Sequence, residues 1–185
     1  MLESSDAQLV GQCLQGDNRG FDGLVKRYQR RIISFCYRML GDADLASDAA
    51  QDSFLKAYHA LDSFRTDASF LSWMFKIAGN TCLDILRKQS RQRTDLLEDS
   101  PAESGQLHDT TPSPEKSALF NEKDRIIRQA ILDLPESYRQ PIVLFYFGDL
   151  SLKEVAKTLE RPEGTIKSSL HAAREMLRRK LEGVV

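Results

Sequence analysis

An acidic, proline-containing segment, TDLLEDSPAESGQLHDTTPSPE, divides this chain in two. It runs from Thr94 to Glu115 and holds six carboxylates and three prolines, but no Lys, Arg, Phe, Tyr or Trp. A segment of this composition buries too little apolar surface to offset the entropy that it would lose on ordering. We therefore expect a flexible linker over residues 94–118, between two small domains formed by residues 1–93 and 119–185.

Both domains show the apolar spacing of α-helices. Between Phe21 and Cys36, apolar residues recur every three or four positions, and Gly41 then ends the pattern. Asp42 is a suitable N-cap for the next helix, which is expected to reach about Leu61. We find no alternating apolar and polar run with turn dipeptides that would require a sheet. The predicted fold class is therefore all-α, with two small helical domains joined by the acidic linker.

The helix expected over residues 70–88 has two different faces. Its apolar face consists of Phe70, Met74, Ile77, Thr81 and Ile85, with Leu71 and Ala78 beside it. A second strip consists of Trp73, Lys76, Asn80 and Arg87. An aromatic ring, an amide and two cations suit unpaired nucleic acid, because the ring stacks on bases and the cations bind phosphates. Asp84 interrupts the strip, so this helix alone also fits a structure in which Trp73 packs on a neighbouring helix and the charges are solvated.

Residues 151–181 have the layout of a helix-turn-helix. Ser151 and Glu154 form a predicted capping box for a short first helix. The sequence ERPEG then breaks the chain, and Thr165 is expected to cap a longer second helix. A basic strip on this second helix consists of Lys167, His171, Arg174 and Arg178. A basic second helix after a tight turn is the arrangement that enters the DNA major groove, and a purely structural helical hairpin is the alternative.

Composition restricts where nucleic acid can bind. The formal net charge is −1, so any binding must rest on local basic patches. Three widely spaced cysteines without a C-x-x-C pair favour reduced core thiols, and no metal or other cofactor is expected. The N-terminal residues lack the features of a signal peptide, and no run approaches the roughly 20 apolar residues that cross a bilayer. We expect a cytoplasmic protein without direct membrane insertion.

Two stretches together resemble the extracytoplasmic-function (group 4) sigma factors of bacterial RNA polymerase. They are FDGLVKRYQRRIISFCYRMLGDADLASDAAQDSFLKAYHALDSFRTDASFLSWMFKIAGNTCLDILRK and LPESYRQPIVLFYFGDLSLKEVAKTLERPEGTIKSSLHAAREMLRRKL. The resemblance covers essentially the whole chain and implies a σ2 domain and a helix-turn-helix σ4 domain. It implies a protein that is not an enzyme. Such a protein binds core polymerase, recognises the −10 and −35 promoter elements and directs transcription initiation, in a stress or envelope response.

The resemblance also implies three binding surfaces. The −10 nontemplate strand would contact Phe64, Arg65, Trp73, Lys76, Asn80, Arg87 and Lys88. The −35 duplex would contact Thr165, Lys167, Ser168, His171, Arg174 and Arg178. The β′ clamp helices of the polymerase would dock on Asp48, Gln51, Asp52 and Leu55, a face that could otherwise be a solvated acidic surface. The polymerase β flap and an anti-sigma factor, which in this family can be membrane-bound, complete the implied partners.

The chain departs from the family pattern at a few positions. Ser169 and Ala172 stand where relatives often carry basic residues, which suggests weaker phosphate attraction, and Asp52 stands where Glu is more usual. The main alternative is a helix-turn-helix transcriptional activator that acts without replacing a sigma factor. It would need neither the aromatic strip nor the acidic face. A hydrolase or transferase is disfavoured, since the chain lacks G-x-x-x-x-G-K-[ST], G-x-S-x-G and H-E-x-x-H motifs.

Overall fold

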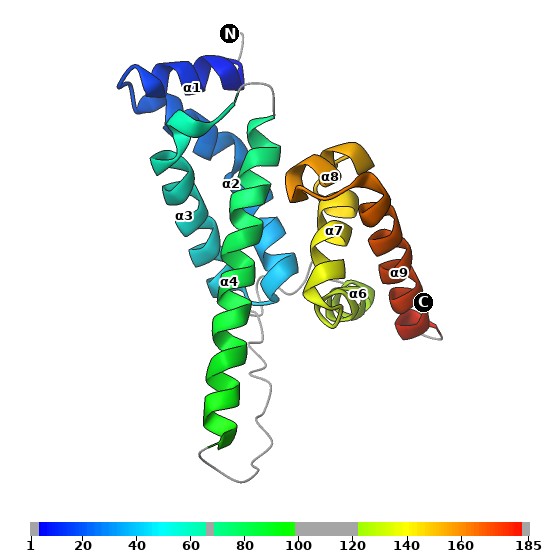
Figure 1. Ribbon diagram of the computed structural model, residues 1–185. Helices are drawn as coiled ribbons and strands as arrows, with labels where there is room; N and C mark the ends of the chain where they lie inside the picture. Colours follow the sequence, from blue (N-terminus) through cyan, green and yellow to red (C-terminus); the bar gives the residue numbers. More distant parts are fainter. Residues whose placement is uncertain (1–3, 66–68, 99–121, 183–185) are drawn as a thin grey trace.

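The computed structural model describes residues 4–65, 69–98 and 122–182, and every regular element in these ranges is helical (Figure 1). The N-terminal half contains α1 (Asp6–Leu14), α2 (Arg19–Leu40), α3 (Ala43–His59), the 3₁₀ turn η1 (Leu61–Ser63) and α4 (Phe70–Glu98). The C-terminal half contains α6 (Glu122–Leu132), α7 (Glu136–Phe147), α8 (Leu152–Leu159) and α9 (Glu163–Leu181). The all-α prediction is confirmed. Residues 99–118 of the predicted linker lie outside the described residues, and no helix within those residues is long and apolar enough to span a membrane.

The N-terminal half is a bundle of α2, α3 and α4, with α1 across one end (Figure 1). Gly41 ends α2 as predicted: its φ of 81° lies in the left-handed region, and its N–H donates to the Tyr37 carbonyl over 2.8 Å. Asp42 caps α3, because its carboxylate accepts a hydrogen bond of 2.8 Å from the Leu45 N–H. These two adjacent residues therefore set the turn that returns α3 along α2.

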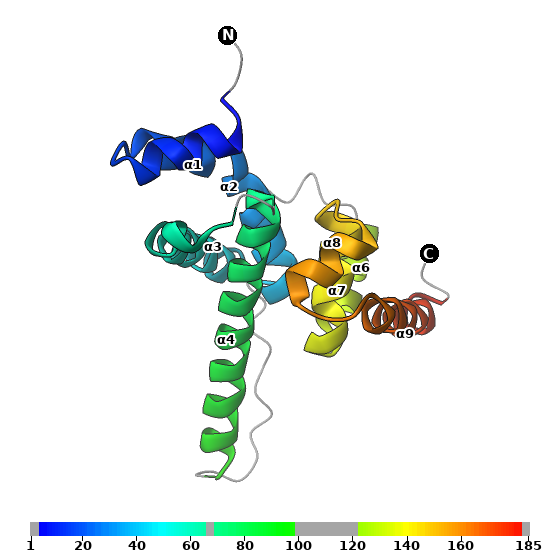
Figure 2. The ribbon, with the colours of Figure 1, turned by 45° about the horizontal axis from the view of Figure 1, so that its top comes forward.

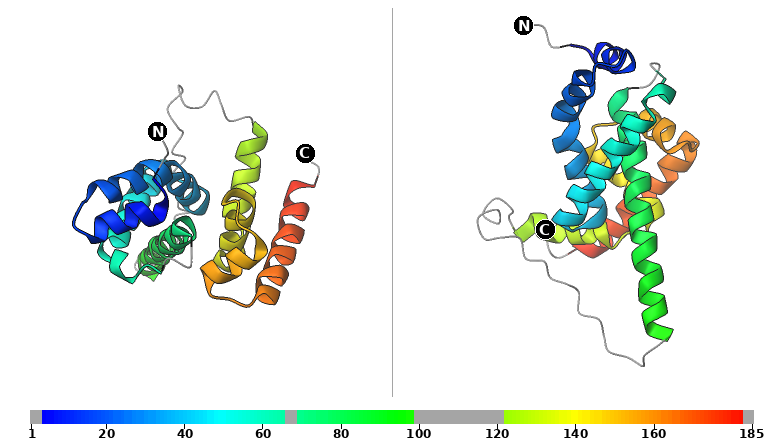
Figure 3. Two further views of the ribbon diagram at one scale, coloured as in Figure 1. Left: turned by 90° about the horizontal axis from the view of Figure 1, so that it is seen from above. Right: turned by 90° about the vertical axis from the view of Figure 1, so that its left-hand side faces the viewer.

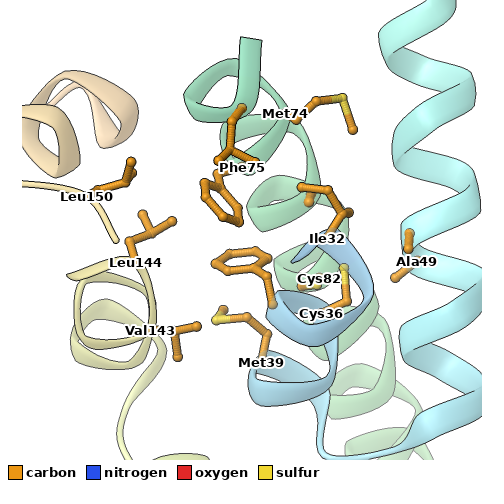
Figure 4. Packing of buried hydrophobic residues seen from close by; sticks show 14 of the residues in the cluster. Ile32, Cys36, Met39, Ala49, Met74, Phe75, Cys82, Val143, Leu144 and Leu150 are labelled. Carbon is orange, nitrogen blue, oxygen red and sulfur yellow. The ribbon is translucent and has the colours of Figure 1, made fainter. Parts of the chain in front are cut away.

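The buried cysteines contribute to the core of this bundle. Cys36 on α2 and Cys82 on α4 are fully buried side by side, whereas Cys13 is half-buried, and all three are free thiols (Figure 4). A hydrogen bond with Cys82, followed by burial, raises the pKa of the Cys36 thiol. A thiol held protonated in this way is a weak nucleophile, so Cys36 acts as a small apolar residue in the core.

Helix α4 is longer than the sequence pattern indicates. It continues past Lys88 to Glu98 and so includes the first residues of the predicted linker. The segment QSRQRTDLLE that follows Lys88 has no Gly or Pro and consists largely of residues with good helix propensity. Figures 1 and 2 show that this end of α4 projects beyond the other helices. The helical backbone therefore continues into the first residues of the predicted linker, and the bounds of the two domains stay a prediction.

The C-terminal half contains the predicted helix-turn-helix. The capping box of α8 is present: Ser151 Oγ accepts from the Glu154 N–H over 3.3 Å, and the Glu154 carboxylate accepts from the Ser151 N–H over 2.8 Å. The start of α9 differs from the prediction. Its N-cap is Pro162, which makes no side-chain cap hydrogen bond, and Thr165 lies within the first turn of the helix and does not cap it.

The two halves pack against each other through α7 and α8 on one side and α2 and α4 on the other (Figure 3). Figure 4 shows Val143, Leu144 and Leu150 facing Met39 and Phe75, and all five side chains are buried. This contact joins the apolar residues of both halves into one cluster. The sequence pattern predicted two separate domains and gave no sign of this packing.

Candidate nucleic-acid and polymerase interfaces

An aromatic cluster forms where η1 leads into α4. The ring centroids of Phe64 and Trp73 lie 5.1 Å apart. Both rings pack against Phe70, with centroid distances of 5.6 Å for Phe64 and 5.7 Å for Trp73. Phe70 is buried, whereas Phe64 and Trp73 are each half-buried. The structure therefore brings two predicted single-strand residues together on a buried support. Trp73 both packs on its neighbours and leaves part of its ring open to stacking.

The predicted polar residues of this surface lie along α4. Asn80 and Lys88 are exposed, and the Arg87 guanidinium lies 3.6 Å from the carboxylate of Asp84, the residue that interrupts the strip. Arg65 is exposed and directly follows Phe64 of the aromatic cluster. Asn80, Arg87 and Lys88 thus follow the aromatic pair along one helix, in an order that suits a strand running over it.

Lys76 has a partner that the sequence did not predict. Its Nζ lies 2.6 Å from Oε1 of Glu160, which ends α8 in the other half of the chain. The Lys76 and Glu160 side chains keep 40% and 71% of their surface exposed, so this ion pair by itself contributes little stability. Its position is informative, because it shows that the end of α8 lies next to the predicted single-strand surface.

A groove of about 580 Å³ separates the two halves beside this ion pair. The N-terminal wall of the groove includes four of the predicted −10 residues, namely Phe64, Arg65, Trp73 and Lys76. The opposite wall is formed by α8, through Glu154, Lys157 and Thr158. Four of the seven predicted single-strand residues therefore line a groove whose other wall is α8, while they keep part of their surface open to solvent.

The predicted duplex-reading residues share the exposed side of α9. Thr165, Lys167, Ser168, His171, Arg174 and Arg178 are all exposed. Ile166, Leu170 and Ala173 bury the opposite side of the helix. The structure therefore gathers these residues on one exposed side of α9, and their contact with a groove of DNA stays a prediction.

Two of these residues have contacts within α9 that limit their roles. The Ser168 hydroxyl donates to the carbonyls of Gly164 and Thr165, each over 3.0 Å. Arg178 pairs with Glu175 at 3.2 Å and with Glu182 at 3.3 Å, so two carboxylates compete with phosphate for its guanidinium. Lys167, for which no such pair is present among the described residues, is therefore better placed than Arg178 to attract the phosphates of DNA.

The predicted polymerase-binding residues share one face of α3. Asp48, Gln51, Asp52 and Leu55 are exposed, with 59% of the Leu55 surface open. On the other side of the helix, Ala46, Ala50, Phe54 and Ala57 are buried against the bundle, as predicted. Figures 1 and 3 place α3 on the side of the N-terminal half away from α7, α8 and α9. An exposed leucine between acids and an amide suits the anchor of a protein contact.

Sequence reasoning missed the residues that connect the halves. Arg139 on α7 is buried and donates to the carbonyls of Met39, over 2.7 Å, and of Leu134, over 3.0 Å, and also to Leu132. Burial lowers the pKa of this guanidinium, and the partial negative charge at the ends of α2 and α6 compensates for its charge. Arg139 stands between Tyr138 and Gln140 in the sequence, and these neighbours do not identify a partner on another helix.

Comparisons with known proteins find a sigma-70 region in each half of the chain. Residues 24–92 match Sigma-70 region 2, and residues 124–177 match Sigma-70 region 4. The chain is 35% identical to the RNA polymerase sigma-H factor of Pseudomonas aeruginosa, over 98% of this chain and 96% of the relative. It is 36% identical to the ECF RNA polymerase sigma factor SigW of Bacillus subtilis, over 97% of this chain and 98% of the relative. The two matched regions and the all-helical fold together define a protein of the sigma-70 type.

The fold is also similar to solved structures. One is CnrH in complex with the cytosolic domain of CnrY, with a TM-score of 0.71 and 23% identity over 98% of this chain and all of that one. Another is the sigma factor RpoE in complex with the anti-sigma factor NepR from Bartonella quintana, with a TM-score of 0.70 and 24% identity over 89% of this chain and 98% of that one. The chain belongs to the extracytoplasmic-function group of RNA polymerase sigma factors.

Proposed function

We propose that this sigma factor docks on core RNA polymerase through the exposed face of α3 and brings two separate DNA-binding surfaces to a promoter. The observation that carries the proposal is the presence of three unlike surfaces on one chain. They are an acidic face with an exposed leucine, an aromatic and basic strip, and a basic helix-turn-helix. A helix-turn-helix activator needs only the third.

The two DNA-binding surfaces suit different forms of DNA. Phe64 and Trp73 offer ring faces, which stack on bases only after the duplex has opened. Asn80 lies about two turns after Trp73 on α4 and offers an amide that can form hydrogen bonds with base edges. The basic face of α9 suits the major groove of an intact duplex. The N-terminal half thus takes the opened −10 strand, and the C-terminal half takes the −35 duplex.

The proposal includes further partners and a location. The chain carries out no reaction itself and acts with polymerase in the cytoplasm, in a stress or envelope response. Contacts to the β′ clamp helices and the β flap hold it on the polymerase, and an anti-sigma protein regulates it. Support for the last partner comes from RpoE and CnrH, whose structures contain NepR and the cytosolic domain of CnrY.

Run-off transcription with purified core polymerase tests the proposal. Templates are taken from a genomic library and transcripts are mapped, since the promoter sequence is part of the result. We expect discrete start sites that require both core polymerase and this chain. An activator would instead raise transcription only when a second sigma factor is also present, and that outcome would reject the proposal.

A further inference from the structure

Helix α1 lies across the end of the N-terminal bundle at which η1 leads into α4 (Figure 1). Leu9 and Val10 of α1 are buried in the core of the bundle. Two glycines of α2 allow this close approach. A Cβ at Gly20 would overlap the carbonyl oxygen of Leu9, and a Cβ at Gly23 would lie 3.0 Å from Leu9 Cδ2. Helix α1 is therefore packed closely on α2, in contact with the turn that leads to the predicted single-strand surface.

Asp6 in the first turn of α1 connects this helix to Tyr28 on α2. Its Oδ2 accepts a hydrogen bond of 2.5 Å from the Tyr28 hydroxyl, and its Oδ1 lies 2.5 Å from Nη1 of Arg27. The Asp6 and Arg27 side chains keep only 27% and 28% of their surface exposed, so solvent and salt screen this pair less than a fully exposed one. A hydrogen bond to a charged acceptor is stronger than a neutral one, and it fixes the direction of the Tyr28 hydroxyl.

The cap of α1 does not depend on Asp6. Ser5 Oγ accepts a hydrogen bond of 3.3 Å from the Gln8 N–H, and the Gln8 side chain accepts one of 2.7 Å from the Ser5 N–H. This capping box already holds the first turn of α1. The Asp6 carboxylate is therefore available for the contact with α2, and its removal should leave α1 helical.

The ring of Tyr28 reaches the aromatic cluster through Phe70. The ring centroids of Tyr28 and Phe70 lie 5.8 Å apart, with an angle of 31° between the ring planes. Phe70 is the buried first residue of α4, and Phe64 and Trp73 pack on it. Aromatic pairs have preferred relative orientations, so a change in the Tyr28 ring changes the seat of Phe70. A continuous path of contacts thus runs from Asp6 to the two half-exposed rings.

We propose that Asp6 and Tyr28 are positioning residues for the predicted single-strand surface. Acting through Phe70, they fix where Phe64 and Trp73 present their rings to the bases of an opened strand. Asp6 and Tyr28 do not touch the strand themselves. A binding surface is only as precise as the side chains that support it, so a small shift of both rings lowers the affinity for the strand without unfolding the bundle. The inference rests on the proposed function for the identity of the ligand.

Two substitutions break the same hydrogen bond from its two sides. Asp6→Ala removes the acceptor, whereas Tyr28→Phe removes the hydroxyl and keeps the ring that packs on Phe70. The double variant completes a double-mutant cycle. The charge-matched control is Asp22→Ala, because Asp22 is an exposed acid in the first turn of α2. All variants are made in the full chain.

Trp73 is the only tryptophan of the chain, so the fluorescence of the free chain reports on the aromatic cluster directly. We expect Asp6→Ala and Tyr28→Phe to shift its emission to longer wavelength and to increase its quenching by acrylamide. With core polymerase bound, each should weaken binding to a promoter with a preformed bubble about three- to tenfold, the loss expected for one hydrogen bond. The double variant should bind no more weakly than Asp6→Ala. Asp22→Ala should match wild type, and affinity for core polymerase should be the same in every variant.

A purely structural role for this contact would give a different result. The variants would then melt at a lower temperature but, measured well below it, would keep the Trp73 emission and the bubble affinity of wild type, and this outcome rejects the proposal. An additive loss in the double variant also rejects it, because Asp6 would then not act through Tyr28. If Asp6→Ala fails to fold, Tyr28→Phe decides on the same two readouts. Failure of the wild-type holoenzyme to bind the bubble rejects the proposed function, and Trp73 emission alone then decides whether Asp6 and Tyr28 position the rings.

Discussion

Leu55→Ala tests the proposed docking face of α3. Full burial of a leucine contributes about 1.5–3 kcal/mol, and 59% of the Leu55 surface is still open to be buried by a partner. The substitution should therefore weaken binding to core polymerase by about 1–2 kcal/mol, which is roughly a five- to thirtyfold increase in Kd. Because Leu55 is already exposed and alanine is a better helix former, the melting temperature should not fall.

Leu14→Ala is the matched control, since Leu14 is 56% exposed and lies at the end of α1, not on α3. Core polymerase is titrated into fluorescently labelled chain, and helical content and melting temperature are measured on the same samples. We expect the loss of affinity for Leu55→Ala alone. An unchanged Kd for Leu55→Ala, or an equal loss for both variants, would show that the face is only solvated surface.

Three further predictions concern other parts of the chain. Arg139→Leu leaves three backbone carbonyls of the buried contact without their donor, so urea unfolding should show a loss of about 3 kcal/mol; a loss near zero would contradict the role of this contact. Burial and the hydrogen bond to Asp6 raise the pKa of Tyr28 to about 12. Its stabilising effect should be complete below the unfolded value near 10 and be lost as pH rises through about 12. Melting curves of Tyr28→Phe should lack this alkaline component, and identical pH profiles would refute it. Replacement of the six carboxylates of Thr94–Glu115 by Asn and Gln should change abortive RNA yields more than promoter choice, and an unchanged abortive pattern on gels would reject a role for the linker charge.

Local chemistry explains what could be predicted about the helices. Gly41, Asp42 and the Ser151 capping box act on groups within a few residues, so the sequence alone contains the interaction. Thr165 was assigned as a cap from the same kind of pattern and was wrong, because Pro162 starts α9 earlier. Pro162 and Thr165 are both consistent with a helix start, and the sequence pattern does not show which of the two begins α9.

Contacts between distant segments explain what could not be predicted. Ile77 and Ile85 were expected in the core of α4 and are only half-buried, whereas Phe75 and Cys82 are fully buried. Phe75 packs on Phe35 of its own half, with ring centroids 5.1 Å apart, and Leu144 and Leu150 of the other half cover it further (Figure 4). Helical periodicity identifies the apolar face that a helix uses within its own domain, but not a second face used by another domain.

The same reasoning applies to the candidate sites. The faces of α3 and α9 were predictable because each lies on one helix, where spacing fixes which residues point outward. The groove over Trp73 and Lys76 was not predictable, since it depends on α8 and Glu160 in the other half of the chain. The individual contacts of these residues with DNA and polymerase remain predictions.

Holoenzyme variants on duplex and pre-opened promoters test most directly whether the two halves read different forms of DNA. With core polymerase bound, Lys167→Ala with His171→Ala should weaken binding to a duplex promoter about tenfold or more, since a good base contact contributes roughly 1–3 kcal/mol. Binding to the same promoter with a preformed bubble should persist. Arg65→Ala with Asn80→Ala should form closed complexes but lose bubble binding and permanganate reactivity at −10, because contacts to a displaced base are each worth about 1–3 kcal/mol. A parallel loss of duplex and bubble binding in both double variants would contradict this division between the halves.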